Sequence, residues 1–188
     1  MSRFNFEMNF PNLITIGRIL LVPVTIWLLI SEAFGWALAV FLIAGISDGI
    51  DGYLARRFSS QTELGAYLDP IADKLLLVSV FAALGIVKIL PAWLVILVIT
   101  RDLLIVAGVM LAWIMDQPFI MKPRAISKLN TAIQILFIAA VLAVYAARLN
   151  PNTLVPLGTV LVAALTFVSG AYYMRDWFLH TNPSKGGK

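Results

Sequence analysis

Residues 47–77 read SDGIDGYLARRFSSQTELGAYLDPIADKLLL, a stretch that lies between two strongly apolar runs. It contains four aspartates, Asp48, Asp51, Asp69 and Asp73. The first two are three residues apart and the last two are four apart, and residues at these separations share one face of an α-helix. Each pair is therefore predicted to project from one face of its own helix. If the two helices pack side by side, the four carboxylates converge.

The composition around this stretch is that of an integral membrane protein. Of the 188 residues, 61% are hydrophobic and 13% are charged, whereas a soluble domain is about half apolar and a quarter charged. Six apolar spans of about 20 residues would use the whole chain, and no alternating pattern indicates a barrel. We expect an all-α polytopic membrane protein with six transmembrane helices in a single domain, residues 1–188, with an interfacial segment at 1–12 and a polar tail at 176–188. The predicted spans are roughly Leu13–Ile30, Trp36–Ile50, Ile71–Val87, Pro91–Met115, Thr131–Ala147 and Leu154–Tyr173.

The distribution of Lys and Arg predicts how these spans are oriented. Cations gather on one side of the predicted bundle, and only Lys88 and Arg148 fall on the other. The positive-inside rule then places both termini and the aspartate stretch at the cytoplasmic face, and a bacterial inner membrane is expected. The net charge of +4 is scattered over loop ends, so it favours anionic lipid over nucleic acid as a partner. The start of the chain lacks the pattern of a cleavable signal, and the absence of cysteine excludes a thiolate nucleophile.

Four converging carboxylates require cations. Two carboxylates about 4 Å apart repel by roughly 4 kcal/mol at an effective dielectric constant near 20. Oxygen ligands alone select hard divalent ions, Mg²⁺ above all, with Mn²⁺ or Ca²⁺ as substitutes. Two such ions would balance four aspartates, and paired ions are a common arrangement for displacement at phosphorus. The alternative is an ordinary solvated cytoplasmic loop.

The spacing of this stretch resembles the CDP-alcohol phosphatidyltransferase family. The pattern D-x2-D-G-x2-A-R-x8-G-x3-D-x3-D is met at every position. Its members here are Asp48, Asp51, Gly52, Ala55, Arg56, Gly65, Asp69 and Asp73. The resemblance covers nearly the whole chain and implies a six-helix membrane enzyme, usually a homodimer. Its reaction is the transfer of a phosphatidyl group from CDP-diacylglycerol to an alcohol, with CMP as the leaving group.

The resemblance also implies a role for each position of the pattern. Asp48, Asp51 and Asp69 coordinate metal ions, two Mg²⁺ being expected, and Asp73 completes the metal site and acts as general base. A direct attack by the alcohol needs no protein nucleophile, although a covalent aspartyl route stays open. The four other positions bind the CDP group. Gly52 and Ala55 lie against the cytidine, and Arg56 and Gly65 contact or make room for the phosphates.

The acceptor alcohol is predicted from two other stretches. "ITRDLLIVAGVMLAW" and "AISKLNTAIQILFIAA" resemble the cardiolipin synthases of this family, which use phosphatidylglycerol. The alternative is the glycerol-3-phosphate acceptor of the phosphatidylglycerolphosphate synthases, to which the opening "NFPNLITIGRILLVPV" is equally similar. The phospholipase D type of cardiolipin synthase needs paired His-Lys-Asp motifs, and a single histidine excludes it.

Four basic residues are candidates for holding the acceptor: Arg101, Lys122, Arg124 and Lys128. Arg101 is followed by Asp102 inside the fourth span, so the two could equally form a buried structural pair. Lys122, Arg124 and Lys128 could equally be orientation signals. Ser127, Asn130 and Gln134 form a polar stripe at the start of the fifth span. Two functions of other classes remain, a cation transporter and a non-catalytic metal-bound scaffold, and neither has a use for the Gly-Ala-Arg spacing.

Overall fold

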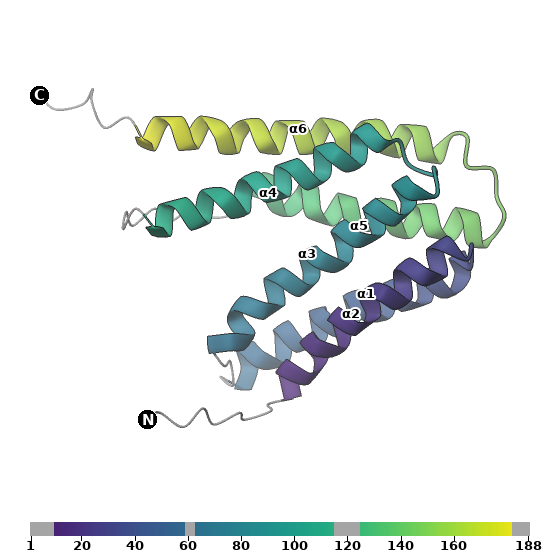
Figure 1. Cartoon of the computed structure of the whole chain (residues 1–188), viewed down its shortest axis with the longest axis horizontal. Helices are drawn as coiled ribbons and strands as arrows, with labels where there is room; N and C mark the ends of the chain where they lie inside the picture. The colour runs from purple at the N-terminus through teal and green to yellow at the C-terminus, as the bar shows by residue number, and fades with distance from the viewer. Residues whose placement is uncertain (1–9, 59–62, 115–124, 182–188) are drawn as a thin grey trace, which may run out of the picture. The chain divides into compact units, whose positions relative to one another are not determined.

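The computed structural model describes residues 10–58, 63–114 and 125–181, with side chains at 17, 19–47, 74–108 and 126–175. Within these ranges every long element is an α-helix and there is no strand (Figure 1). The predicted all-helical fold with six helices is confirmed. The helices are α1 (Phe10–Ile30), α2 (Phe34–Phe58), α3 (Glu63–Ile86), α4 (Ala92–Ile114), α5 (Ala125–Ala146) and α6 (Leu154–Thr181).

The helices are longer than the apolar spans predicted from the sequence. The largest differences lie at the end of α2, which continues from Ile50 to Phe58, and at the start of α3, which begins at Glu63 instead of Ile71. Hydropathy marks only the part of a helix that suits hydrocarbon, whereas the backbone hydrogen-bond ladder continues into polar residues. The motif therefore lies on helices along most of its length.

Several apolar surfaces of the molecule are exposed. Leu136 on α5 and Phe167 on α6 each expose 68% of their surface. Among the described residues, two segments are long and apolar enough to cross a membrane, Ile126–Ala146 and Leu154–Arg175. Exposed apolar faces of this extent suit lipid better than water. The number of membrane crossings and the orientation of the termini stay predictions.

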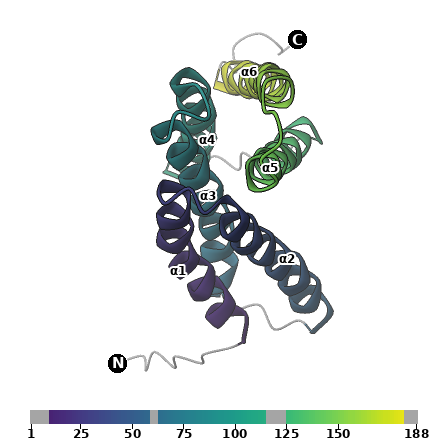
Figure 2. The same ribbon diagram turned by 90° about the vertical axis from the view of Figure 1, so that its right-hand side faces the viewer.

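The chain divides into two compact units, and the first contains α1, α2 and α3. It comprises Met1–Val87 and Leu142–Leu149, so it includes the last turn of α5. Figure 2 shows that α1 lies against both α2 and α3. Phe41, Phe81 and Leu84 are among the buried side chains of its core. At one end, the rings of Phe34 and Tyr145 pack at a centroid distance of 5.1 Å.

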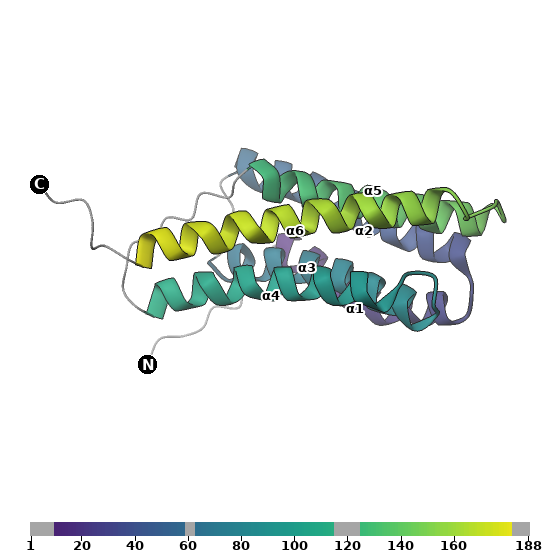
Figure 3. The ribbon, with the colours of Figure 1, turned by 90° about the horizontal axis from the view of Figure 1, so that it is seen from above.

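The second unit contains α4, most of α5, and α6. It comprises Lys88–Val141 and Asn150–Lys188. The helices α4 and α6 pack together and run in the same direction, and α5 runs the opposite way (Figures 1 and 3). Its apolar core includes Leu94, Val98, Ile138 and Val162, all fully buried. Unlike the described interior of the first unit, this one also contains a group of buried polar side chains.

Three helices are followed by a charged residue with a left-handed backbone. Glu32, Lys88 and Arg148 have φ angles of 57°, 59° and 54° after the ends of α1, α3 and α5. At α5 the Leu149 N–H donates to the Val144 carbonyl at 2.9 Å, as in the capping motif that usually employs glycine.

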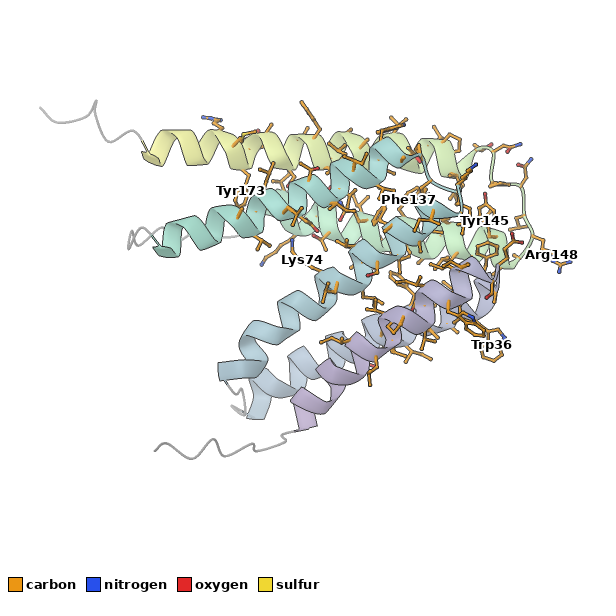
Figure 4. The ribbon with its side chains drawn as sticks, viewed as in Figure 1. Trp36, Lys74, Phe137, Tyr145, Arg148 and Tyr173 are labelled. Carbon is orange, nitrogen blue, oxygen red and sulfur yellow. The ribbon has the colours of Figure 1, made fainter. Side chains whose placement is uncertain are left out.

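Trp36, Tyr145 and Arg148 all lie toward one end of the first unit (Figure 4). Tryptophan and tyrosine at one end of a bundle suit a membrane interface.

The approach of α6 to α5 depends on the absence of a side chain at Gly158. A Cβ atom at this position would overlap the ring of Phe137, which is 6% exposed and has little room to move. We predict that Gly158→Ala lowers the free energy of unfolding by about 1–3 kcal/mol, measured by denaturant unfolding in detergent. Gly170→Ala is the control, because its Cβ would meet only the Cγ of Arg101 at an ordinary 3.8 Å. Equal stability of the two variants would contradict the close approach at Gly158.

Candidate active site

The four aspartates lie on two consecutive helices of the first unit. Asp48 and Asp51 are on α2, and Asp69 and Asp73 are on α3. Their side chains are outside the described ones, as are those of Ala55 and Arg56. The helical backbone at these positions is described, and it confirms that each pair is spaced along a helix. The metal and catalytic roles predicted for the aspartates stay predictions.

The bounds of the two helices give the aspartates a matched register. From Asp48 to the end of α2 at Phe58, and from the start of α3 at Glu63 to Asp73, the separation is ten residues. At 1.5 Å per residue, both positions lie about 15 Å from the connected helix ends. Asp51 and Asp69 lie seven and six residues from the same ends, or about 10 Å.

The connection between the two helices is short. Four residues, 59–62, separate Phe58 at the end of α2 from Glu63 at the start of α3, and the five extended steps between these two residues reach at most about 18 Å. The two helices run in opposite directions within the first unit (Figure 1). Counted from the connected helix ends, Asp51 therefore matches Asp69 and Asp48 matches Asp73 in residue separation, as the predicted convergence of the carboxylates requires. The CDP-binding positions predicted from the motif also lie on these helices, Gly52, Ala55 and Arg56 on α2 and Gly65 on α3.

The described side chains provide no alternative metal site. No three His, Cys, Asp or Glu residues gather among them, and the four aspartates are not part of that set. Lys74, directly after Asp73, is described and lies on α3 (Figure 4).

A second polar cluster lies inside the second unit and centres on Arg101 of α4. The arginine is 4% exposed. Its Nη1 donates to Asp102 Oδ1 at 2.6 Å, so the buried ion pair considered from the sequence is confirmed. Its Nη2 donates to the Ser127 hydroxyl of α5 at 2.6 Å and to the Ser169 hydroxyl of α6 at 2.8 Å. The ion pair joins neighbours on one helix, and the bonds to the two serines tie Arg101 of α4 to α5 and α6.

A second layer of hydrogen bonds joins α5 to α6. Gln134 Nε2 donates to the Thr166 hydroxyl at 3.2 Å, and that hydroxyl donates to Asn130 Oδ1 at 3.1 Å. All three side chains are fully buried. The stripe of Ser127, Asn130 and Gln134 predicted on α5 therefore faces the interior of this unit.

Sequence reasoning missed the residues of α6 that complete both layers. Thr166 and Ser169 are three residues apart, which places them on one helical face. The spacing of two hydroxyl residues on one face of an apolar span was the sequence signal that could have identified them. Thr159, seven residues before Thr166, lies on the same face of α6. Small hydroxyl side chains are common in membrane helices, so only the contacts identify these as a cluster.

The other basic candidates differ from Arg101. Lys128 is exposed on α5, whereas Lys122 and Arg124 lie outside the described residues. An exposed cation surrounded by solvent or headgroups holds an anion weakly. Of the four basic residues predicted to hold the acceptor, Arg101 is the one that the structure shows in a fixed, buried setting.

The class of the protein follows from the motif, its placement on paired helices, and a comparison of the whole chain with known families. Residues 8–172 match the CDP-alcohol phosphatidyltransferase family, and the chain belongs to that family, whose members are integral membrane enzymes that use a divalent metal.

Relatives with two different names resemble the chain to the same degree. A human protein named cardiolipin synthase (CMP-forming) is 36% identical over 158 residues, which cover 76% of this chain and 52% of the relative. A rice (Oryza sativa subsp. japonica) protein named CDP-diacylglycerol–glycerol-3-phosphate 3-phosphatidyltransferase 1, chloroplastic, is 37% identical over 152 residues, 72% of this chain and 46% of its own. A Streptomyces coelicolor cardiolipin synthase (CMP-forming) is 37% identical over 111 residues, 55% of this chain and 52% of its own. The chain thus spans about half the length of these curated relatives.

Substitution of one partner of the Arg101–Asp102 ion pair is predicted to destabilise the fold strongly. Asp102→Leu leaves a buried guanidinium without its carboxylate, and we expect this to cost roughly 3–5 kcal/mol of stability. The double variant Arg101→Met with Asp102→Leu removes both charges and should regain most of that loss. Denaturant unfolding in detergent measures the stability of the single and the double variant. A double variant that is no more stable than Asp102→Leu would show that the loss does not come from the unpaired charge.

Proposed function

We propose that this chain transfers a phosphatidyl group from CDP-diacylglycerol to a hydroxyl of an alcohol and releases CMP. One observation carries the proposal: in a member of the CDP-alcohol phosphatidyltransferase family, all eight motif positions are present, with one aspartate pair on α2 and the other on α3. A cation transporter or a metal-bound scaffold would not need the Gly-Ala-Arg spacing between the pairs. Both would fail to release CMP.

The donor set fits the divalent metal that the family uses. Four carboxylates offer hard oxygen ligands, and their negative charge favours two ions over one. In our proposal Asp48, Asp51, Asp69 and Asp73 hold two Mg²⁺ ions, with Mn²⁺ as a substitute. Bound ions would neutralise the negative charge of the donor's pyrophosphate.

The chain's own residues then bind the donor and move one proton. Gly52, Ala55 and Gly65 leave room for the nucleotide, and the Arg56 guanidinium contacts its phosphates. The Asp73 carboxylate accepts the proton of the acceptor hydroxyl. As that oxygen bonds to the lipid-side phosphorus, the bond from this phosphorus to the CMP oxygen breaks, and CMP leaves with the electron pair. The proton passes from Asp73 to solvent.

For the acceptor we propose phosphatidylglycerol, which would make the chain a cardiolipin synthase; the alternative is glycerol 3-phosphate. Identity to the relatives does not separate the two, because it is 36% to the human cardiolipin synthase and 37% to the rice glycerol-3-phosphate enzyme. The resemblance of Ile99–Trp113 and Ala125–Ala140 to cardiolipin synthases favours phosphatidylglycerol. These segments of α4 and α5 carry Arg101, Ser127, Asn130 and Gln134, the polar cluster of the second unit.

We further propose that the chain is an integral protein of a bacterial inner membrane, acts as a homodimer and has its active site at the cytoplasmic face. The exposed apolar faces of α5 and α6 support the membrane setting. The asymmetry of Lys and Arg supports the orientation. The dimer rests on the family resemblance alone.

The acceptor is tested by offering both alcohols in parallel. Purified protein with CDP-diacylglycerol and Mg²⁺ should release CMP and form cardiolipin with phosphatidylglycerol, and chelation with EDTA should stop both. Radioactive CMP release and thin-layer separation of lipids are the measurements. Consumption of glycerol 3-phosphate alone would make the alternative acceptor correct. No CMP release with any alcohol would contradict the transferase function.

The base is tested by a change from carboxylate to amide. Asp73→Asn should lower the rate of CMP release at least about 100-fold, because a general base typically contributes that much or more. Glu63→Gln is a matched control on the same helix, at a position that the motif leaves open, and should keep near-normal activity. Thermal unfolding of both variants in detergent checks that they are folded. Near-normal turnover in Asp73→Asn would remove the proposed role.

A further inference from the structure

The buried polar cluster of the second unit has unused hydrogen-bonding groups. Three of the five N–H groups of Arg101 donate to Asp102, Ser127 and Ser169, while the Nε–H is buried without an acceptor. In the second layer, Asn130 Nδ2 and Gln134 Oε1 are likewise buried and without a partner. Buried polar groups almost always find partners, and the membrane interior has no bulk water to supply them.

We propose that Ser127 and Ser169 are positioning residues that hold the Arg101 guanidinium so that its Nε–H binds the phosphodiester of the acceptor lipid's headgroup. The inference rests on the proposed function and specifies the chemistry of its acceptor. A guanidinium on a long flexible side chain is fixed only when several of its donors are engaged. Here contacts to three helices fix it: a carboxylate on α4, a hydroxyl on α5 and a hydroxyl on α6.

The charge balance of this cluster favours a phosphodiester over a phosphate monoester. The Arg101–Asp102 pair has no net charge, so it offers an anion directed hydrogen-bond donors and little net attraction. A dianionic monoester such as glycerol 3-phosphate would need further positive charge, and Lys128, next to Ser127, is exposed and screened. A phosphodiester has a single negative charge and suits a neutral cluster. The neutrality of the Arg101–Asp102 pair therefore favours phosphatidylglycerol as acceptor, independently of the sequence resemblance.

The second layer suits the hydroxyl groups of the same headgroup. Asn130 and Gln134 are one helical turn apart on α5 and are both fixed through Thr166. What they leave unused is one donor, Asn130 Nδ2, and one acceptor, Gln134 Oε1. A hydroxyl group both donates and accepts. The glycerol headgroup of the acceptor carries hydroxyls beside its phosphodiester, so the two layers match its two kinds of polar group.

The rival interpretation is that the cluster only fastens three helices together. Hydrogen bonds between membrane helices have this effect in general. A fastening role predicts that loss of a serine hydroxyl lowers stability and leaves acceptor affinity unchanged. A positioning role predicts a selective loss of affinity for the acceptor.

The test measures binding of two soluble headgroups to the full chain in detergent. The probes are glycerophosphoglycerol, which is a phosphodiester, and sn-glycerol 3-phosphate, which is a monoester; calorimetry measures their dissociation constants. We expect the wild-type protein to bind the diester more tightly. Ser169→Ala and Ser127→Ala should each weaken diester binding about 10- to 100-fold, the range of one hydrogen bond to a charged group.

The matched control is Thr159→Val. Thr159 is buried on α6 like Ser169, but its hydroxyl has no hydrogen-bond partner, and valine has nearly the same shape. Its affinity for the diester should equal that of the wild type. In the full reaction, Ser169→Ala should raise the KM for phosphatidylglycerol by a similar factor and leave the KM for CDP-diacylglycerol unchanged. Thermal unfolding of each variant separates a selective effect from a loss of fold.

Three outcomes would overturn the inference: a wild-type protein that binds neither headgroup, tighter binding of the monoester than of the diester, and unchanged affinity in folded Ser169→Ala. Failure of the proposed function gives a different result, which is absence of CMP release by the wild-type protein with every alcohol. The binding measurement does not depend on turnover, so the two failures are distinguishable.

Discussion

The hydrogen bonds of one buried guanidinium determine how the second unit is arranged. Arg101 needs acceptors because it lies inside an apolar helix cluster, and it obtains them from its own helix and from one hydroxyl on each of two others. These bonds bring α4, α5 and α6 to one level. Ser127 on α5 and Ser169 on α6 are thereby matched across the unit, and the layer of Asn130, Gln134 and Thr166 lies on the same faces.

Charge must also be compensated in the first unit, where the charges are negative instead of positive. There the charges are carboxylates, one pair on α2 and the other on α3. No protein cation could balance all four, so the proposed compensation is by metal ions. In the first unit the ionisable groups are spaced by about one helical turn, whereas in the second Arg101 and Asp102 are adjacent on α4. In the proposed reaction one set acts on the nucleotide lipid and the other on the acceptor lipid.

Hydropathy located every helix but underestimated the two that carry the motif. It placed the end of the second span at Ile50 and the start of the third at Ile71, because the residues between are polar. The helices continue through them, since the backbone hydrogen-bond ladder does not depend on side-chain polarity. The periodicity of the aspartates was a better guide than hydropathy, because spacings of three and four residues are meaningful only on a helix.

By itself the sequence determined the helical class, the family, and the positions of the four aspartates, because apolar length and helical spacing are local properties of the chain. It also indicated that Arg101 and Asp102 pair, since a lone charge in a membrane span is costly. It could not show that Ser127 and Ser169 share one guanidinium, or that Thr166 links Asn130 to Gln134. These partners are 26 to 68 residues apart in the chain, so only the packing of α4, α5 and α6 brought them together.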